Sequence, residues 1–294
     1  MTSQETYPLS LGLSACHMLG INPRDMLNQA GLGHLELKQA ANGVSAQDYI
    51  AAWTAMIDLT GRESMPIDLG IAIARGPVVP VFLALDCAPD LERGLRRITR
   101  YKRLIGPSRM HVFGDADNLT VEYESTEPWL ELPSSMMALY LSFVAEKARL
   151  MTARSMIPVA ATLKSEDKNR HALARQLGVL PMYGEKASLT YSRADATSPF
   201  LGSAQGLWEA MEQDLERELA ASVRASSMSS KVTSALLTQM PLGNADVVSI
   251  CDDLGVSRST MQRRLTEEQT TFQQILDDTR EQLAVRYLTK SALS

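Results

Sequence analysis

The chain has 294 residues, enough for two or three domains, and 45% of them are hydrophobic. No apolar run approaches the roughly 18–20 residues that a membrane span requires, so a membrane-spanning protein is not expected. The formal net charge of −5 argues against binding nucleic acid through overall charge, so any contact with DNA must be local.

The sequence lacks the residue patterns of metal sites and common enzymes. Cys16, Cys87 and Cys251 lie far apart and match no metal-ligand spacing, and the four histidines never fall within helical ligand spacing of one another. No nucleophile elbow, phosphate-binding loop or zinc-protease motif occurs, and the glycine-rich residues 31–36 lack the third glycine of a dinucleotide fingerprint. We expect no metal, no cofactor and no enzymatic activity.

The cysteines also bear on the compartment. Residues 13–16 match a bacterial lipoprotein cleavage box, but no Lys or Arg precedes Cys16, as a signal peptide requires. An odd number of scattered cysteines suits free thiols in a reducing cytosol. We therefore expect a cytoplasmic protein.

The first 222 residues alternate between helical and strand-like patterns. Strand-like alternation at 109–114 and 119–124 flanks a Gly-Asp-rich turn and predicts a hairpin, and further strands fit 157–163 and 187–191. This mixture predicts an α+β domain. Apolar residues at helical spacing predict helices over 9–20, 23–31, 45–60, 90–104, 132–152, 167–177 and 204–221.

Two features of this part are candidates for binding a small effector. One is a basic run that includes Arg96 and Arg100, which is either a solvated helix face or a site for an anionic effector. The other is a cluster of apolar and aromatic residues, which is either plain core or an adaptable pocket. The residues of this cluster singled out as effector-binding candidates are Met136, Tyr140 and Phe143.

An apolar stripe follows near the end of the same part. Trp208, Met211, Leu215 and Leu219 recur at steps of three or four residues and are flanked by acidic residues. The stripe either packs on its own domain or forms a dimer interface. As a dimer interface, we expect it to be partly exposed in the isolated subunit and covered in a homodimer.

A small polar segment at 223–230 predicts a linker between domains at 1–222 and 231–294. In the second domain, apolar spacing over 247–254 predicts a short helix, Gly255 permits a tight turn, and Ser257 is a good N-cap for the next helix. Met261 and Leu265 face inward in that helix. This is a helix-turn-helix, and an ordinary helical hairpin in another core is its alternative. The residues predicted to contact DNA are Ser257, Arg258, Ser259, Thr260, Gln262, Arg263 and Arg264.

These residues carry a family resemblance. Gly255-x-Ser257-x3-Met261-Gln262-Arg263-Arg264-Leu265, followed by an apolar pattern over 272–288, resembles the first helix-turn-helix and linker helix of AraC/XylS-type transcription regulators. Departures are Met261 for the usual Leu, Cys251 for a small Ala, and Gln269 for the Gly that often closes the recognition helix. The family carries two such units, and the given sequence ends where the second would begin, so the all-α domain is expected to be incomplete.

The first part resembles the arabinose-binding-type sensor domain of these regulators over about residues 10–220. The resemblance rests on Leu27-x2-Ala30-Gly31-Leu32, Leu91-x3-Leu95-x2-Ile98-x2-Tyr101 and Tyr183-Gly184-x4-Ser188-Leu189. It implies a regulator that binds an operator in double-stranded DNA under the control of a small effector, with RNA polymerase and a second copy of the chain as further candidate partners. The alternative is a protein-interaction module whose helix-turn-helix docks a protein.

Overall fold

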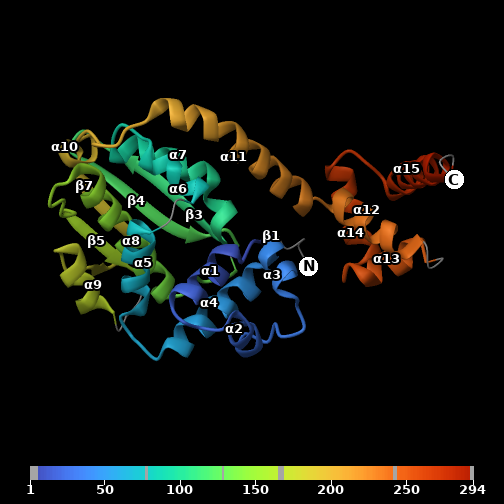
Figure 1. Ribbon diagram of the computed structural model, residues 1–294, viewed down its shortest axis with the longest axis horizontal. Helices are drawn as coiled ribbons and strands as arrows, with labels where there is room; N and C mark the ends of the chain where they lie inside the picture. Colours follow the sequence, from blue (N-terminus) through green and yellow to red (C-terminus); the bar gives the residue numbers. More distant parts are fainter. Residues whose placement is uncertain (1–5, 77–78, 128, 165–168, 241–243, 292–294) are drawn as a thin grey trace. The chain divides into compact units, whose positions relative to one another are not determined.

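The structure is a computed structural model that describes residues 6–76, 79–127, 129–164, 169–240 and 244–291 (Figure 1). Within these ranges the side chains at 223–226, 230, 234, 237–238 and 282–291 are not described. The chain forms two compact units, one from Thr6 to Glu218 and one from Leu219 onward.

The first unit is built on a five-stranded sheet. Its strand order is β3-β4-β7-β5-β6, and neighbouring strands are antiparallel except β5 and β6. The hairpin predicted around residues 114–118 joins the first two strands. The bounds are β3 Ser108–Gly114, β4 Asn118–Ser125, β5 Ala160–Leu163, β6 Met182–Tyr183 and β7 Ala187–Ser192.

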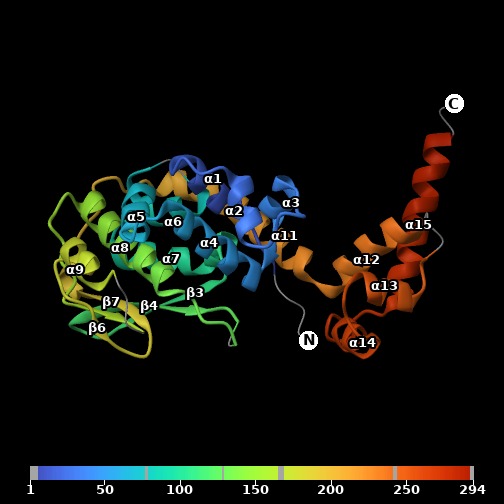
Figure 2. The same ribbon diagram turned by 90° about the horizontal axis from the view of Figure 1, so that it is seen from below.

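The two faces of this sheet differ in polarity. Along β4, Leu119, Val121 and Tyr123 are buried on one face, as the two-residue period of a strand requires. On the other face, Thr120 and Thr190 of β7 share a hydrogen bond of 2.9 Å between their hydroxyls. Helices cover the apolar face (Figure 2). The unit is therefore α+β, as the sequence predicted.

Helices and a small two-stranded sheet, β1 Thr6–Tyr7 with β2 Val44–Ser45, complete the first unit. The longest helix inside it, α8, is buried along most of its length. The helices are α1 Ser10–Met18, α2 Pro23–Gln29, α3 Leu37–Asn42, α4 Ala46–Thr60, α5 Met65–Arg75, α6 Pro80–Asp86, α7 Leu91–Tyr101, the 3-10 turn η1 Lys102–Ile105, α8 Ser134–Thr152, α9 Arg170–Leu177, α10 Arg193–Ala196 and α11 Gln205–Ser226.

Helices α5 and α6 were not predicted from the sequence. Helix α5 is apolar on most sides, apart from Asp68 and Arg75, and contains Gly70, a poor helix former, so these residues were not recognised as a helix. The structure supplies the reason for that glycine. A Cβ at Gly70 would lie 2.6 Å from the carbonyl oxygen of Leu139, so α5 and α8 pack more closely than any side chain would allow.

Ion pairs stabilise the packing of α8. The ammonium of Lys147 lies 2.7 Å from a carboxylate oxygen of Asp86 in α6, and Arg75 of α5 lies 2.5 Å from Glu146. Both α8 residues are buried, so each charge needs the partner that it has.

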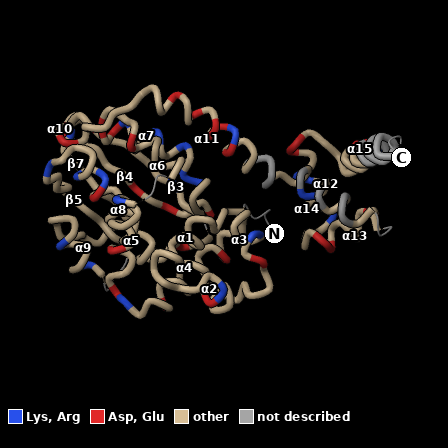
Figure 3. Tube along the Cα trace, in the orientation of Figure 1, with Lys and Arg blue, Asp and Glu red and all other residues tan. Residues whose placement is uncertain are grey.

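Two residues of the stripe on α11 are buried within the first unit. Trp208 is 3% exposed and Leu215 is 1% exposed. The Trp208 ring contacts Tyr101 edge-on at 6.0 Å between centroids and lies under the guanidinium of Arg97 at 4.9 Å. The prediction that these two residues are partly exposed in a single subunit is therefore wrong. Met211 and Leu219 are half-buried, and acidic residues recur along the helix (Figure 3).

The second unit is helical. Its apolar core includes Met228, Val232, Ile250, Met261 and Leu265. The segment 223–230 differs from the expected linker, because α11 continues to Ser226 and the next helix begins at Met228. Small residues such as Ser and Ala are compatible with helix, so composition alone did not separate the two outcomes. The helices are α12 Met228–Gln239, α13 Val247–Asp253, α14 Arg258–Glu267 and α15 Phe272–Ser291.

No single helix in the described part of the chain is both long and apolar enough to cross a membrane. By length and composition, one bent pair, α5 with α6, could do so together. Cys16, Cys87 and Cys251 are free and buried.

Candidate functional site

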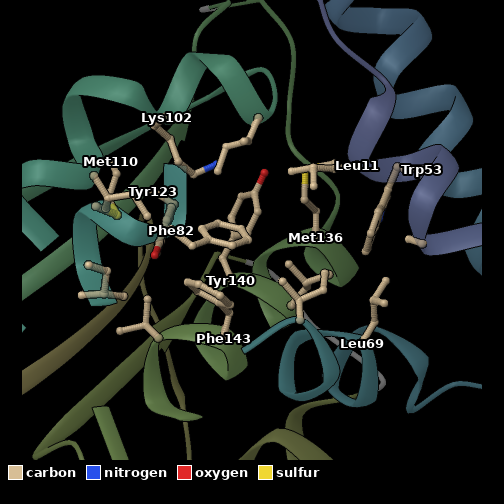
Figure 4. Close-up of a pocket in the computed structure, with 18 of the residues that line it drawn as sticks. Leu11, Trp53, Leu69, Phe82, Lys102, Met110, Tyr123, Met136, Tyr140 and Phe143 are labelled. Carbon is tan, nitrogen blue, oxygen red and sulfur yellow. The ribbon is translucent and has the colours of Figure 1, made fainter. Parts of the chain in front are cut away.

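The first unit encloses an apolar cavity of about 90 Å³. Its walls come from α1, α4, α5, α6, α7 and α8, with η1, β3 and β4 (Figure 4). Engineered apolar cavities of about 150 Å³ in other proteins bind benzene, so a cavity of this order among apolar side chains can hold a small organic group. Side chains that line it include Leu11, Trp53, Leu69, Phe82, Leu95 and Met110.

The structure places three of the predicted effector residues on this wall. Met136, Tyr140 and Phe143 project from α8, and Phe143 packs on Phe82 with ring centroids 4.6 Å apart. Tyr140 packs on Tyr123 of β4 at 5.1 Å. The α8 cluster is thus both core and cavity wall.

The other two predicted effector residues lie elsewhere. Arg96 donates to the Glu92 carboxylate at 3.0 Å and to the Val112 carbonyl at 3.1 Å. Arg100 pairs with Glu216 of α11 at 3.0 Å. Both point away from the apolar stripe of α7, so their place in an effector site is not supported.

A residue of the same basic run that was not singled out does reach the cavity. Lys102 is 5% exposed, and its Nζ lies 4.1 Å from the centroid of the Tyr140 ring. It follows Ile98 by four positions and so continues the inner stripe of α7, a spacing that could have identified it. Its ammonium donates to Ser108 Oγ at 2.6 Å, and Ser108 Oγ donates to the Tyr140 hydroxyl at 3.1 Å.

The remaining polar groups of the wall are neutral and mostly satisfied. Tyr49 donates to the Ile105 carbonyl at 2.9 Å, and the indole of Trp53 donates to Ser135 Oγ at 2.9 Å. Burial raises the pKa of Tyr49 and the pKa of Tyr123. Both phenols therefore stay protonated at neutral pH. Of the residues that line the cavity in the described part of the chain, Lys102 is the one with a charged side chain.

In the second unit, α13 and α14 are joined by a tight turn at the position where the sequence predicted a helix-turn-helix. Gly255 has φ +61°, a conformation that favours glycine. Its amide donates to the Asp252 carbonyl at 3.1 Å, and the Val256 amide donates to the Cys251 carbonyl at 3.0 Å. These two bonds form a Schellman motif that ends α13. Ser257 Oγ then accepts from the Thr260 amide at 3.2 Å and caps α14.

Helix α14 presents a polar face to solvent. Arg258, Ser259, Gln262 and Arg263 are exposed, and Ser257 is exposed at its start. Thr260 is half-buried, and its hydroxyl lies 2.8 Å from Ser257 Oγ. The guanidinium of Arg263 pairs with Glu267 one turn later at 2.6 Å.

Arg264 does not belong to that face. It is 7% exposed, because it follows Met261 by three positions and precedes Leu265, so it shares their inward side. Burial lowers the pKa of its guanidinium, and the neighbouring charge of Arg263 lowers it further. The prediction that Arg264 contacts DNA is not supported by this placement.

Comparison with known proteins identifies the family. Residues 20–200 match the model of the arabinose-binding domain of AraC transcription regulators, N-terminal part. The chain belongs to the AraC family of transcription regulators. Lys102, Ser108 and the α8 side of the cavity all fall inside the matched residues.

The AraC-type chain has a distant structural neighbour. The transcriptional regulator CdpR from Pseudomonas aeruginosa has a TM-score of 0.45 and 16% identity, over 90% of this chain and 84% of that one. A search of curated proteins finds no match.

Proposed function

We propose that this transcription regulator binds operator DNA through α14 and that an effector in the cavity of the first unit changes its affinity for that DNA. The observation that carries the proposal is the exposed polar face of α14. Met261 and Leu265 anchor the helix in the core, while Arg258, Gln262 and Arg263 face solvent. A recognition helix held in this way can enter the major groove without disturbing its own unit.

Arg263 is the candidate reader of a guanine. Its fork of donors matches the two acceptors on the major-groove edge of that base. The pair with Glu267 is exposed at both ends, so separating it costs about 0.5 kcal/mol or less. Ser259 and Gln262 lie beside Arg263 on the helix surface and would contact neighbouring bases.

Helix α7 offers a route from the cavity to α11. Leu95 and Ile98 line the cavity, and Lys102 follows directly after the end of α7. On the same helix, the Tyr101 hydroxyl donates to Glu216, and Arg100 pairs with that carboxylate. A ligand that shifts Lys102 would therefore bias contacts of α11, the helix that continues into the second unit. Such a ligand acts only through different affinities for the two arrangements.

We also propose a homodimer and a contact with RNA polymerase, since both would suit a regulator in the cytoplasm. A dimer interface would have to use surface other than the buried Trp208 and Leu215.

The proposed binding of DNA by α14 is tested with Arg263→Ala. A duplex selected by the wild type from a random pool is titrated alongside an unselected duplex, each at two salt concentrations. We expect a loss of about 1–3 kcal/mol on the selected duplex and little on the other. Arg62→Ala is the control, because it removes an equally exposed, ion-paired arginine from the first unit.

The result also separates the alternatives. Equal losses on both duplexes would make Arg263 a phosphate contact. Binding of the wild type that is insensitive to salt would contradict a DNA interface and favour docking of a protein.

A further inference from the structure

Two lysines of the first unit are almost fully buried, and they differ in their partners. Lys147, 8% exposed, pairs with both carboxylate oxygens of Asp86 at 2.7 and 2.8 Å. Lys102, 5% exposed, forms no ion pair with any carboxylate among the described residues. A buried charge without a counter-charge is costly, and natural proteins usually pair it.

The groups around Lys102 compensate its charge in part. The Tyr140 ring lies 4.1 Å from Nζ, which is a favourable cation–π distance. Ser108 Oγ accepts one of the three ammonium hydrogens. Within the described part of the chain the ammonium has no second acceptor, so up to two donors remain for a ligand.

The same end of the cavity holds further donors. Ser108 donates to the Tyr140 hydroxyl, which leaves the hydrogen of that hydroxyl without an acceptor among the described residues. The Lys102 ammonium and the Tyr140 hydroxyl are both bonded to Ser108 Oγ, so donors and one positive charge gather at one end of the cavity, while the rest of the wall is apolar. The cavity has a cationic end and an apolar body.

We propose that the effector of the cavity is a small monocarboxylate with an apolar body, its carboxylate bound by Lys102 and Tyr140. The proposal rests on the proposed function of this cavity and specifies the ligand class. One ammonium balances one negative charge. A phosphate ester near charge −2 would leave excess negative charge in apolar surroundings.

A free sugar fits poorly, although the family model is that of an arabinose-binding domain. Each sugar hydroxyl that loses water needs a hydrogen-bond partner. Most of the wall is made of Leu, Ile, Met and Phe side chains, which supply none.

The test compares ligands of equal shape and different charge on the full chain. Thermal unfolding and calorimetric titration are measured with hexanoate and benzoate, with hexanamide and benzamide, and with L-arabinose and inorganic phosphate. We expect the two acids to raise the melting temperature in a saturable way, by mass action on the folded state. The amides, arabinose and phosphate should have no such effect at the same concentrations.

Three variants then test whether the effect arises at Lys102 and Tyr140. Lys102→Met should bind hexanoate roughly tenfold or more weakly, the loss expected of a charge-assisted hydrogen bond, and should fold at least as stably as the wild type without ligand. Lys147→Met is the matched control. This substitution leaves the Asp86 carboxylate without its counter-charge, so it should lower the melting temperature and leave the affinity for hexanoate unchanged. Tyr140→Phe, which removes one donor and keeps the ring, provides a second readout should Lys102→Met not fold.

Three results would overturn the proposal. They are equal shifts by acids and amides, no saturable shift with either acid, and wild-type affinity for hexanoate in Lys102→Met or, should that variant not fold, in Tyr140→Phe. The proposed control of DNA binding by an effector is tested separately, by measuring the affinity for DNA with each ligand. If the acids bind without changing the affinity for DNA, the monocarboxylate class is supported but effector control of DNA binding is contradicted. If the amides change the affinity for DNA, effector control is supported but the monocarboxylate class is contradicted.

Discussion

At the scale of single residues, the two helices of the helix-turn-helix end in the same way with different residues. Helix α13 closes on Gly255, and α14 closes on Gln269, whose φ is +58°. The Gln269 amide donates to Thr266 at 2.9 Å and the Thr270 amide donates to Leu265 at 2.8 Å, which is again a Schellman motif. Glutamine thus occupies a left-handed conformation that costs residues with a side chain about 1 kcal/mol.

Gln269→Gly should therefore stabilise the second unit by roughly 0.5–1 kcal/mol, less any gain in the entropy of its unfolded chain. Urea unfolding followed by circular dichroism measures the change. All three tryptophans, at positions 53, 129 and 208, lie in the first unit, so a transition without a fluorescence change reports the second unit. Gln262→Gly, within α14, is the control and should destabilise. A destabilised Gln269→Gly would mean that the side chain contributes more than its backbone costs.

In the candidate site, helical spacing predicted the exposed residues of α14 but not the buried cations. The outward positions Arg258, Gln262 and Arg263 could be read from their distance to Met261 and Leu265. The same spacing places Arg264 and Lys102 on inward faces, but their charge suggested solvent. Burial of a cation depends on partners outside its own helix, such as Ser108 of β3 and Tyr140 of α8 for Lys102, and the pattern of one helix does not contain them.

At the scale of elements, α14 also stabilises the start of α12. Glu268, directly after α14, accepts from the backbone amides of Met228 at 2.6 Å and Ser229 at 2.8 Å. Burial of the Glu268 carboxyl acts to raise its pKa, but the hydrogen bonds from Ser229 and Met228 and the positive charge of Arg264 together lower the pKa below the ordinary value of 4.5. A carboxylate at the first amides of a helix stabilises that helix.

Glu268→Ala should lower the free energy of unfolding of the second unit by about 1 kcal/mol at neutral pH. Because the folded pKa is depressed, the contribution is complete above pH 4.5 and is lost as the pH falls below it. The difference between variant and wild type should therefore shrink in acid. Glu267→Ala is the control, since Glu267 contacts Arg263 and no α12 amide. A difference that stays constant down to low pH would contradict the role of the charge.

The elements themselves were predicted unevenly. Helices α4 and α8 and the β3–β4 hairpin were predicted close to their observed bounds, because both helices are long and the burial of β4 follows the two-residue period of a strand. Helices α5 and α6 were missed, since both are apolar on most sides. The strands β1, β2 and β6 have two residues each, too few for any period to show.

At the scale of the whole molecule, the sequence predicted a sensing part followed by a helix-turn-helix, and the chain forms two compact units that divide between Glu218 and Leu219. It did not show that α11 belongs to the packing of the first unit and also continues into the second. That outcome depends on contacts of Trp208 and Glu216 with α7, about 110 residues earlier in the chain.

Communication between the units should depend on Tyr101. Burial and the hydrogen bond to Glu216 raise the pKa of Tyr101, so its hydroxyl remains a donor at neutral pH. Tyr101→Phe removes this bond and keeps the ring against Trp208. We expect unchanged affinity of the cavity for hexanoate within about twofold, but a smaller effect of hexanoate on DNA affinity, because the bond contributes roughly 1 kcal/mol of coupling at most.

The measurement is a DNA titration with and without saturating hexanoate. Tyr183→Phe, at an exposed tyrosine of β6, is the control and should leave the ligand effect intact. An unchanged ligand effect in Tyr101→Phe would exclude this route from α7 to α11.

The burial of the three cysteines has a practical consequence for optical work on this regulator. Burial raises the pKa of Cys16 to about 11 and also raises the pKa of Cys87 and Cys251, so all three remain protonated and shielded at neutral pH. Maleimide dyes react with accessible thiolates. A pair of cysteines introduced on the surface, one in each unit, would accept fluorophores against a silent background. Energy transfer between the dyes could then follow the two units in the native chain, with none of its own cysteines replaced.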